Sequence, residues 1–361
     1  MQPAANSVTS VNVIDDAARQ MGICNACRYC EGFCAVFPAM ERRVEFTPET
    51  IHYLANLCHN CAECYYACQY APPHEFAINV PKVFAEVRAQ TYEHFGSRVF
   101  RWNPLWMLLP AVVLVVVLTF GRTAPDANFY AVTPHNVLVA VFGVLFAGIF
   151  VVHFAGFLRF WRATGGGILT PAALIAAAKD TLALKNLGSG GTGCTYPDEQ
   201  HSQARRIHHH FTFYGFLLCF ASTSVAAFYD AFLGWKAPYP YLSAPVLLGI
   251  AGGIGLLIGP AGLYGLKLRR DPAIGDERQD AGEFAFMGLL WLTSFTGLLL
   301  LALRENARFM GALLAVHLVF VAALFLTLPY GKFVHGVYRL AALLRSAHES
   351  ARGQNQSRGQ S

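Results

Sequence analysis

Apolar and polar positions divide the chain near residue 100. Residues 1–98 mix polar and apolar positions, whereas residues 99–347 are dominated by long apolar runs. Six of these runs are long enough to cross about 30 Å of hydrocarbon as helices. They are 104–121, 135–160, 209–233, 243–266, 284–303 and 309–330. The pattern predicts a mainly α-helical protein, with an N-terminal domain followed by a six-helix transmembrane bundle.

Composition and the distribution of charge support a membrane location. Hydrophobic residues make up 55% of the chain and charged residues 14%, which is outside the usual globular balance. Most Lys and Arg residues lie on the side of residues 1–98, and the opposite loops hold only Arg122, Lys236, Arg304 and Arg308. Both termini are therefore predicted to be cytoplasmic, at a bacterial inner membrane. The net charge of +5 is modest, and no nucleic-acid partner is expected.

One long cytoplasmic loop, 163–206, joins the second and third predicted spans. Its segment TPAALIAAAKDTLAL predicts an amphipathic helix along the membrane face, with Thr170 as N-cap and Pro171 as the first helical residue. The stretch GSGGTG at 188–193 matches the dinucleotide pattern G-x-G-x-x-G. It does not follow a strand, so a flexible loop is predicted instead. The polar tail, 348–361, is predicted to be disordered.

Eight of the ten cysteines lie in two runs, CNACRYCEGFC at 24–34 and CHNCAECYYAC at 58–68. The N-terminus has no apolar signal-peptide core, which favours a reducing compartment and metal ligation over disulfides. Each run has the C-x2-C-x2-C-x3-C spacing of bacterial ferredoxins. In two-cluster ferredoxins the fourth cysteine of each run ligates the other cluster. The N-terminal domain is therefore predicted to be a two-cluster ferredoxin-type domain.

This spacing predicts two [4Fe-4S] clusters with exchanged ligands. The first set is Cys24, Cys27, Cys30 and Cys68, and the second set is Cys58, Cys61, Cys64 and Cys34. The proline that usually follows the fourth cysteine is absent, with Ala35 and Gln69 in its place. A zinc site is the alternative, although it usually uses two CxxC pairs separated by a loop. Cys194 and Cys219 have no partners at ligand spacing and are predicted to carry no chemistry.

Histidines within or beside the predicted spans are candidates for haem b ligation, because an unpaired ionisable group in lipid is costly. The candidates are His208, His209, His210, His153, His317 and His335. His335 and the triplet 208–210 both fall near the inner membrane edge. An axial pair of His335 with His209 or His210 is therefore predicted, with His208 and His153 as alternatives.

His317 and His335 are eighteen residues apart, which is five helical turns. They would share a face of one helix if that helix continued past Pro329. His317 has no histidine at equal depth in the third span. One haem is therefore expected, and a second haem would need another partner for His317.

The motifs CNACRYCEGFC, LANLCHNCAECYYACQYAPPHEFAINVP, RRIHHHFTFYGFLLCF and LPYGKFVHGVYR together resemble the tricarballylate-utilisation membrane protein family (TcuB, also called CitB). The resemblance covers about residues 20–345. It implies that electrons come from the FADH2 of a separate soluble flavoprotein, tricarballylate dehydrogenase, and pass through iron–sulfur clusters and haem to the membrane. The membrane half is also similar to the cytochrome b subunits of respiratory nitrate reductases.

Together these patterns predict a membrane electron-transfer protein that reduces quinone. By position alone, Lys332, Tyr330 and Arg339 are candidates for a quinone pocket. The sequence shows no flavin or nucleotide motif in a suitable context, so substrate oxidation is expected on the partner. The alternatives are an iron–sulfur and cytochrome b subunit of another respiratory oxidoreductase (heterodisulfide-, fumarate- or nitrate-reductase-like) and a non-redox membrane anchor that binds zinc.

Overall fold

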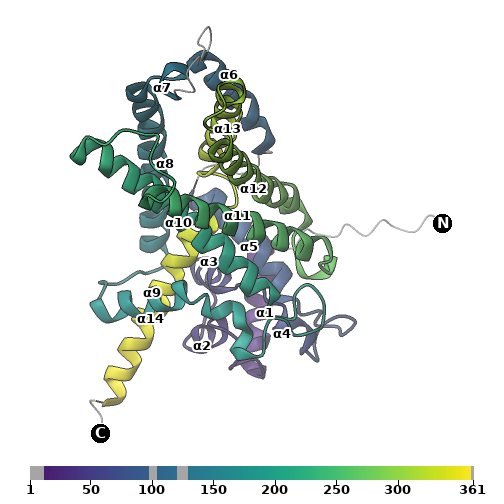
Figure 1. Ribbon diagram of the computed structural model, residues 1–361. Coiled ribbons are helices and arrows are strands. Elements are labelled where there is room, and N and C mark those ends of the chain that lie inside the picture. The colour runs from purple at the N-terminus through teal and green to yellow at the C-terminus, as the bar shows by residue number, and fades with distance from the viewer. Residues whose placement is uncertain (1–11, 97–103, 120–128, 359–361) are drawn as a thin grey trace, which may run out of the picture.

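The computed structural model describes residues 12–96, 104–119 and 129–358, which are mainly helical and contain no named β-strand. Five helices form the N-terminal domain: α1 Val13–Cys27, α2 Val36–Glu41, α3 Pro48–Leu57, α4 Glu63–Tyr66 and α5 Val80–Phe95. They gather at one end of the molecule, and the long apolar helices extend from the other (Figure 1).

The three longest helices of the N-terminal domain, α1, α3 and α5, begin at side-chain caps and bury apolar residues. Asn12, Thr47 and Asn79 accept hydrogen bonds from backbone N–H groups in the first turns of α1, α3 and α5. Such caps satisfy donors that have no partner within the helix. The buried faces meet in one core, which includes Met21 and Phe84. The cysteine runs are attached to this core.

Within the described residues, five helices are long and apolar enough to cross a membrane. They are α8 His135–Ala163, α10 Ala204–Leu233, α11 Ala244–Leu268, α12 Asp280–Ala302 and α13 Ala307–Thr327. The first predicted span, 104–121, contains a 3₁₀ turn, η2 Pro104–Met107, and then the shorter apolar helix α6 Leu108–Thr119. Residues 120–121 of that span lie outside the described residues. A further short helix, α7 Phe129–Val132, precedes α8.

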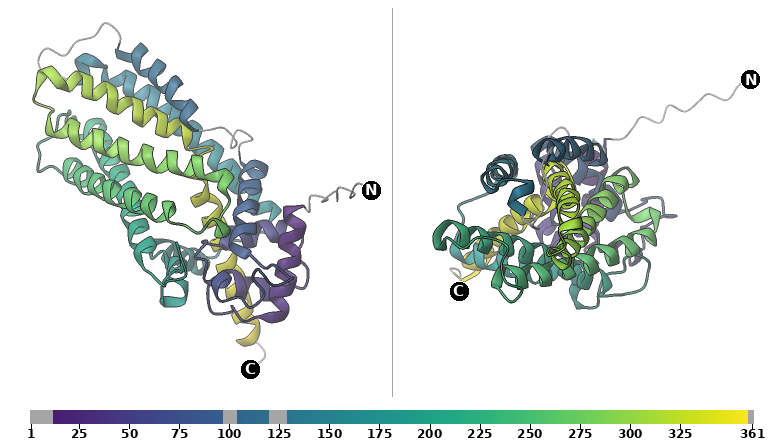
Figure 2. Two further views of the ribbon diagram at one scale, coloured as in Figure 1. Left: turned by 90° about the vertical axis from the view of Figure 1, so that its right-hand side faces the viewer. Right: turned by 45° about the horizontal axis from the view of Figure 1, so that its top comes forward.

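Glycines allow α10 and α11 to pack closely. A Cβ atom on Gly252 would lie 2.8 Å from the Gly215 carbonyl oxygen, and one on Gly255 would lie 3.0 Å from the Phe211 carbonyl oxygen. Helix backbones approach this closely in membranes where small residues line the interface. This contact fixes the position of α10, which carries the histidine triplet, against the rest of the bundle (Figure 2).

The last helix, α14 Val334–Arg358, is separate from α13. The condition under which His317 and His335 would share one helix face, a helix that continues past Pro329, is therefore not met. Pro329 lacks a backbone N–H and lies between the two helices, where the chain turns through 328–333. After the turn, α14 runs along the N-terminal domain, and its Tyr338 and Ala341 are part of that domain's core.

The tail prediction also needs correction. Residues 348–358, predicted to be disordered, continue α14. Glu349 stabilises the first part of this segment, because it forms ion pairs with Arg43 at 2.6 Å and with Arg345 at 2.9 Å. His348 is buried. The predicted domain boundary at residue 98 therefore misses one element, since α14 packs on the N-terminal domain.

The long loop 163–206 is largely ordered and packed. Its amphipathic helix is α9 Pro171–Leu182, and Thr170 caps it by accepting a hydrogen bond from the Ala173 N–H at 3.3 Å, as predicted. The glycine-rich stretch overlaps the 3₁₀ segment η3 Lys185–Gly191, in which Leu187 and Ser189 are buried. The prediction of a flexible loop is wrong here. Two further 3₁₀ turns, η4 Pro272–Ile274 and η5 Glu277–Gln279, join α11 to α12.

Candidate functional site

One set of thiols lines a cavity of about 240 Å³ in the N-terminal domain. The set consists of Cys24, Cys27, Cys30 and Cys68. α1 ends at Cys27 because Arg28 adopts the left-handed conformation with φ 55°, and this turn lets Cys30 face the end of the helix. Cys27 is exposed, so this cavity lies near the protein surface.

These thiols affect one another's pKa values. Burial, followed by Cys30 and Cys68, raises the pKa of the Cys24 thiol to about 12. Burial and then Cys68 raise the pKa of Cys30 to about 12. Converging thiolates repel one another, and a bound cationic core relieves that repulsion. The donor set therefore fits an iron–sulfur cluster, for which thiolates are the usual ligands.

A second set of thiols lies deeper in the molecule. It consists of Cys34, Cys58, Cys61 and Cys64, of which Cys58 and Cys61 are buried. Burial, followed by Cys61 and Cys58, raises the pKa of Cys34 well above its usual value. α3 ends just before Cys58, and Ala62 adopts the left-handed conformation with φ 67° before α4. The chain therefore turns between Cys58 and Cys64, which brings the thiols of the second run together.

Cys68 thus lines the cavity of the first run, and Cys34 lies near Cys58 and Cys61 of the second run. The exchange of ligands between two clusters stays a prediction from the spacing. Cys64 also lines the first cavity, so the two sets adjoin. Among the described residues, no three His, Cys, Asp or Glu side chains are placed to hold a single metal ion. A four-iron cluster is wider than one ion, and its ligands stand correspondingly farther apart.

Arginines connect the second set to the helices that carry the candidate histidines. Arg339 of α14 donates a hydrogen bond to the Cys58 carbonyl oxygen at 2.7 Å, and the buried Arg88 donates to the same oxygen at 3.3 Å. Arg205 of α10 donates to the Asn60 carbonyl oxygen at 2.6 Å. Residues four apart share a helix face. Arg339 therefore lies one helical turn from His335, and Arg205 lies one turn from His209.

His209 and His335 face each other across α10 and α14. Their ring centroids are 6.3 Å apart, with the ring planes at 67°. The Nδ1–H of His335 donates to the Lys332 carbonyl oxygen, which leaves Nε2 to face a ligand. His59, which the sequence reasoning did not single out, lies beside Arg339 and His209. Its Nδ1–H donates to the Leu57 carbonyl oxygen at 2.8 Å.

The burial of His59, followed by the charge of Arg339, lowers its pKa well below the usual value. A neutral imidazole therefore lies next to Cys58 in the chain and near His209 in space. The only sequence signal for it was its place inside the motif CHNC. A histidine between two cysteines is easily attributed to the cysteine run alone.

The remaining candidate histidines point elsewhere. His208 packs against Gly262 of α11, where a Cβ atom would fall 2.1 Å from its Nδ1. His210 stacks on Tyr214 with centroids 5.7 Å apart. His153 donates from Nδ1 to the Ile149 carbonyl oxygen at 2.8 Å. His317 lies 3.0 Å from the Thr296 hydroxyl, between α12 and α13. Of the triplet, the structure brings His209 to His335.

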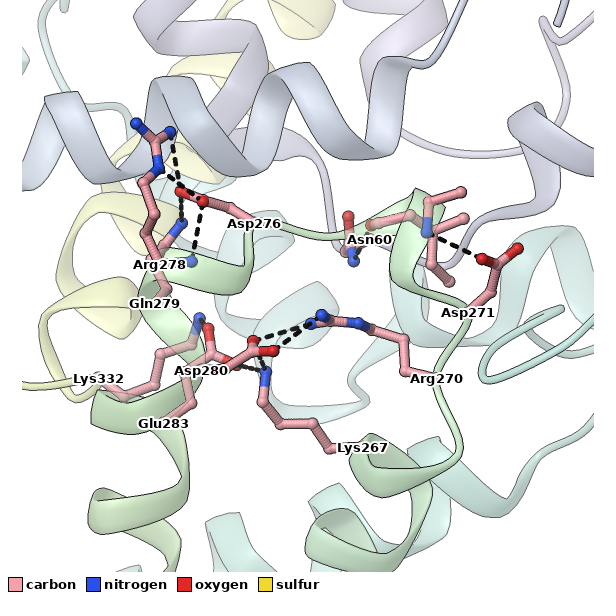
Figure 3. A network of polar contacts seen from close by, with 12 residues as sticks. Asn60, Lys267, Arg270, Asp271, Asp276, Arg278, Gln279, Asp280, Glu283 and Lys332 are labelled. Atoms are coloured by element: carbon pink, nitrogen blue, oxygen red, sulfur yellow. Dashed lines mark hydrogen bonds and ion pairs between the residues drawn. The ribbon is translucent and has the colours of Figure 1, made fainter. Parts of the chain in front are cut away.

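A cluster of buried charges lies at the ends of α11 and α12 (Figure 3). Lys267 pairs with Asp280 at 2.7 Å and with Glu283 at 2.5 Å, and Glu283 also pairs with Lys332. Arg270 pairs with Asp280 at 3.0 Å. The network ties both helix ends to the segment before His335.

All three residues that were quinone candidates by position already have partners. Lys332 pairs with Glu283, Arg339 binds the Cys58 carbonyl oxygen, and the Tyr330 hydroxyl donates to the Met107 sulfur at 3.4 Å. Arg339 therefore helps to position residues 58–61, called the cysteine loop below, and Lys332 helps to position the segment that holds His335.

Cys194 has a defined place beside the second thiol set, which the sequence did not indicate. It is fully buried and packs with Cys61 in one apolar cluster. The Thr195 hydroxyl donates to the Cys61 carbonyl oxygen at 3.3 Å. More than a hundred residues separate Cys194 from the cysteine runs, so ligand spacing could not reveal this contact.

Comparisons with known proteins agree along the whole chain. A family model described as citrate utilization protein B matches residues 98–356, and a model of the citrate utilization protein B Fer4-like domain matches residues 17–94. The citrate utilization protein B of Escherichia coli is 50% identical over 353 residues, covering 94% of this chain and 93% of that protein. No solved structure gives a significant match.

Proposed function

The chain belongs to the citrate utilization protein B family, and from this membership and the site geometry we propose that it carries electrons from a partner flavoprotein to membrane quinone. It is a membrane iron–sulfur protein, by its Fer4-like domain and its five long apolar helices. In this proposal, Cys24, Cys27, Cys30 and Cys68 hold one [4Fe-4S] cluster, and Cys58, Cys61, Cys64 and Cys34 hold another. His209 and His335 hold haem b. When bound, these groups supply one-electron redox chemistry.

The first thiol set is suited to receiving electrons from a soluble partner. Its Cys27 is exposed, and the neighbouring Tyr29 is 69% exposed. A flavoprotein can therefore approach this set closely. The partner proposed here is an FAD-dependent dehydrogenase that oxidises a tricarboxylate, with tricarballylate as the first candidate.

The second thiol set is suited to passing electrons toward the membrane, and one observation carries the proposal. Arg205 and Arg339 bind the cysteine loop, and each lies one helical turn from a histidine of the pair His209–His335. The arginines thus fix the loop to both helices at once. His59 lies near both arginines and near His209. The order of use follows from this placement, with the surface set first and the buried set second.

The pair His209–His335 is suited to holding haem. It joins two facing helices, as the axial histidines of helical bundles do. The bond from His335 Nδ1 to a backbone carbonyl is the kind of contact that orients a metal-binding imidazole. The rings are close, but they do not stack on each other.

The proposed location is the bacterial inner membrane, with both termini in the cytoplasm. Phe95 at the end of α5, Phe160 near the end of α8 and Tyr338 of α14 all belong to the core of the N-terminal domain. α8 has 29 residues and is about 43 Å long, so it begins far from that core. The chain must reach its start by way of α6, which supports six crossings and termini on one side.

A reconstituted electron-transfer assay tests the function. Anaerobic full-length protein is mixed with the flavoprotein encoded beside its gene, and tricarballylate or citrate is then added. We expect reduction of haem, seen in its visible absorption, with one of these substrates, and reoxidation on addition of a quinone. If dithionite reduces the haem but no tricarboxylate does so through the flavoprotein, the proposed partnership is wrong.

Substitution of single histidines tests the haem site. His209→Ala and His335→Ala are each expected to remove the haem absorption of the purified protein, because each removes one axial ligand. The matched changes His210→Ala and His317→Ala should retain it, since these side chains contact Tyr214 and Thr296 instead. Partial loss of haem in His317→Ala would reveal a second haem, and full haem in His335→Ala would refute the assigned pair.

A further inference from the structure

The glycine-rich loop at 185–195 covers the second thiol set from the membrane domain. The Ser189 hydroxyl and the Cys194 thiol both lie beside the Cys61 thiol. Ser189 is 4% exposed and Cys194 is fully buried. The Ser189 hydroxyl has no hydrogen-bond partner in the described part of the chain, so its proton is free to turn toward a deprotonated Cys61 sulfur.

The backbone of this loop is built for close approach. Ser189 has φ 42° and Gly190 has φ 68°, both in the left-handed region. A Cβ atom on Gly190 would lie 3.2 Å from the carbonyl oxygen of Gly32, which belongs to the first cysteine run. Glycine at 190 thus lets the loop lie against the cysteine run.

Two further contacts hold the loop in place. Cys194 and Ser202 exchange backbone hydrogen bonds of 3.1 and 2.9 Å. His201 contacts Glu63 of α4 at 2.9 Å, next to Cys64. The loop is therefore anchored to the same short helix that follows Cys61, and its donors keep a fixed relation to that sulfur.

We propose that Ser189 and Cys194 are positioning residues that donate hydrogen bonds to the Cys61 sulfur and so raise the reduction potential of the second cluster. The inference rests on the proposed function, because it needs Cys61 as a cluster ligand. Ligation removes the thiol proton of Cys61 and leaves its sulfur as an acceptor only. Cys194 donates to the Leu187 carbonyl oxygen at 2.9 Å, and its one proton can turn to the sulfur instead.

Hydrogen bonds to a cluster sulfur stabilise the reduced, more negative state and raise the potential. A second cluster of higher potential draws electrons away from the surface cluster and toward His209 and His335. The loop thereby gives the transfer its direction. The glycine pattern that resembles a nucleotide fingerprint has, on this account, a role in tuning a cluster.

Redox titration followed by EPR tests the proposal on full-length, cluster-loaded protein. The second cluster is identified as the signal that is lost in Cys58→Ala. The double variant Ser189→Ala/Cys194→Ala is expected to shift the electron distribution between the clusters about tenfold toward the first, which is about 59 mV for one electron. Cys194→Ser keeps a donor and should shift the distribution less than Cys194→Ala. Cys219→Ala, a matched thiol change in α10, should leave it unchanged.

The possible outcomes distinguish failure of this inference from failure of the proposed electron-transfer function. Two loaded clusters with an unchanged second potential in the double variant would overturn the role of the loop and leave the proposed function intact. Absence of iron and sulfide from the loaded wild-type protein would overturn both. A parallel fall in both potentials would point to general loosening of the domain, and would also contradict the specific role of Ser189 and Cys194.

Discussion

Alanine at Cys34 is expected to abolish the second cluster and to spare the first, although Cys34 belongs to the first run. Burial and the neighbours Cys61 and Cys58 define its surroundings. Cys68→Ala should do the reverse, because Cys68 lines the cavity of Cys24 and Cys27. Each variant should lose about half of the iron, and its EPR spectrum should retain one cluster.

Reference variants make the comparison specific. Cys34→Ala should match Cys58→Ala in its remaining EPR signal, and Cys68→Ala should match Cys27→Ala. If each run held its own cluster, Cys34→Ala would match Cys27→Ala instead. That result would contradict the exchange of ligands between the runs.

Much of the site could be predicted from local sequence, because its determinants are local. The cysteine spacing predicts which thiols would share a set. Hydropathy predicts six spans, and five of them are long apolar helices in the described part of the chain. Thr170 and Pro171 predict the start of α9, since a cap depends only on the next few residues. The predicted depth of each histidine in its span reduced the candidate partners of His335 to His209 and His210.

The parts that were missed depend on contacts between distant segments. Nothing near Cys194 in the sequence indicates that it packs on Cys61. The tail after residue 347 is polar, and its order depends on the ion pair of Glu349 with Arg43, more than three hundred residues away. His59 lies near residues of α10 and α14, and the sequence of the cysteine run does not indicate these neighbours. Tertiary contacts override local propensity in each case.

The missed α14 contact also changes the view of the domains. Tyr338 and Ala341 of α14 belong to the core of the N-terminal domain. His335 is on the same helix, so the N-terminal domain positions this member of the proposed haem pair. Cluster site and membrane site therefore share one rigid element. Arg339, on the same helix, binds the Cys58 carbonyl oxygen directly.

Glu283→Gln is expected to cost about 1–3 kcal/mol of stability, because it leaves the partly buried ammonium group of Lys332 without its partner. Lys332 pairs with Glu283 at the end of α12, and Lys267 keeps Asp280 when Glu283 is lost. The side chain of Glu283 is only 21% exposed, so water replaces the lost interaction poorly. The unfolding temperature in detergent should fall by several degrees. Asp180→Asn removes a surface ion pair with Lys185 and should change stability by no more than about 1 kcal/mol.

The double variant Glu283→Gln/Lys332→Met separates the charge effect from general disturbance of the helix ends. Replacing both members of a buried ion pair by neutral side chains is often close to neutral in stability. The double variant should therefore recover most of the loss seen in Glu283→Gln. Haem content should follow the same order, because the Lys332 backbone carbonyl orients His335. A double variant as unstable as the single one would show that Glu283 stabilises the junction by packing, and that the charge of Lys332 is not the cause.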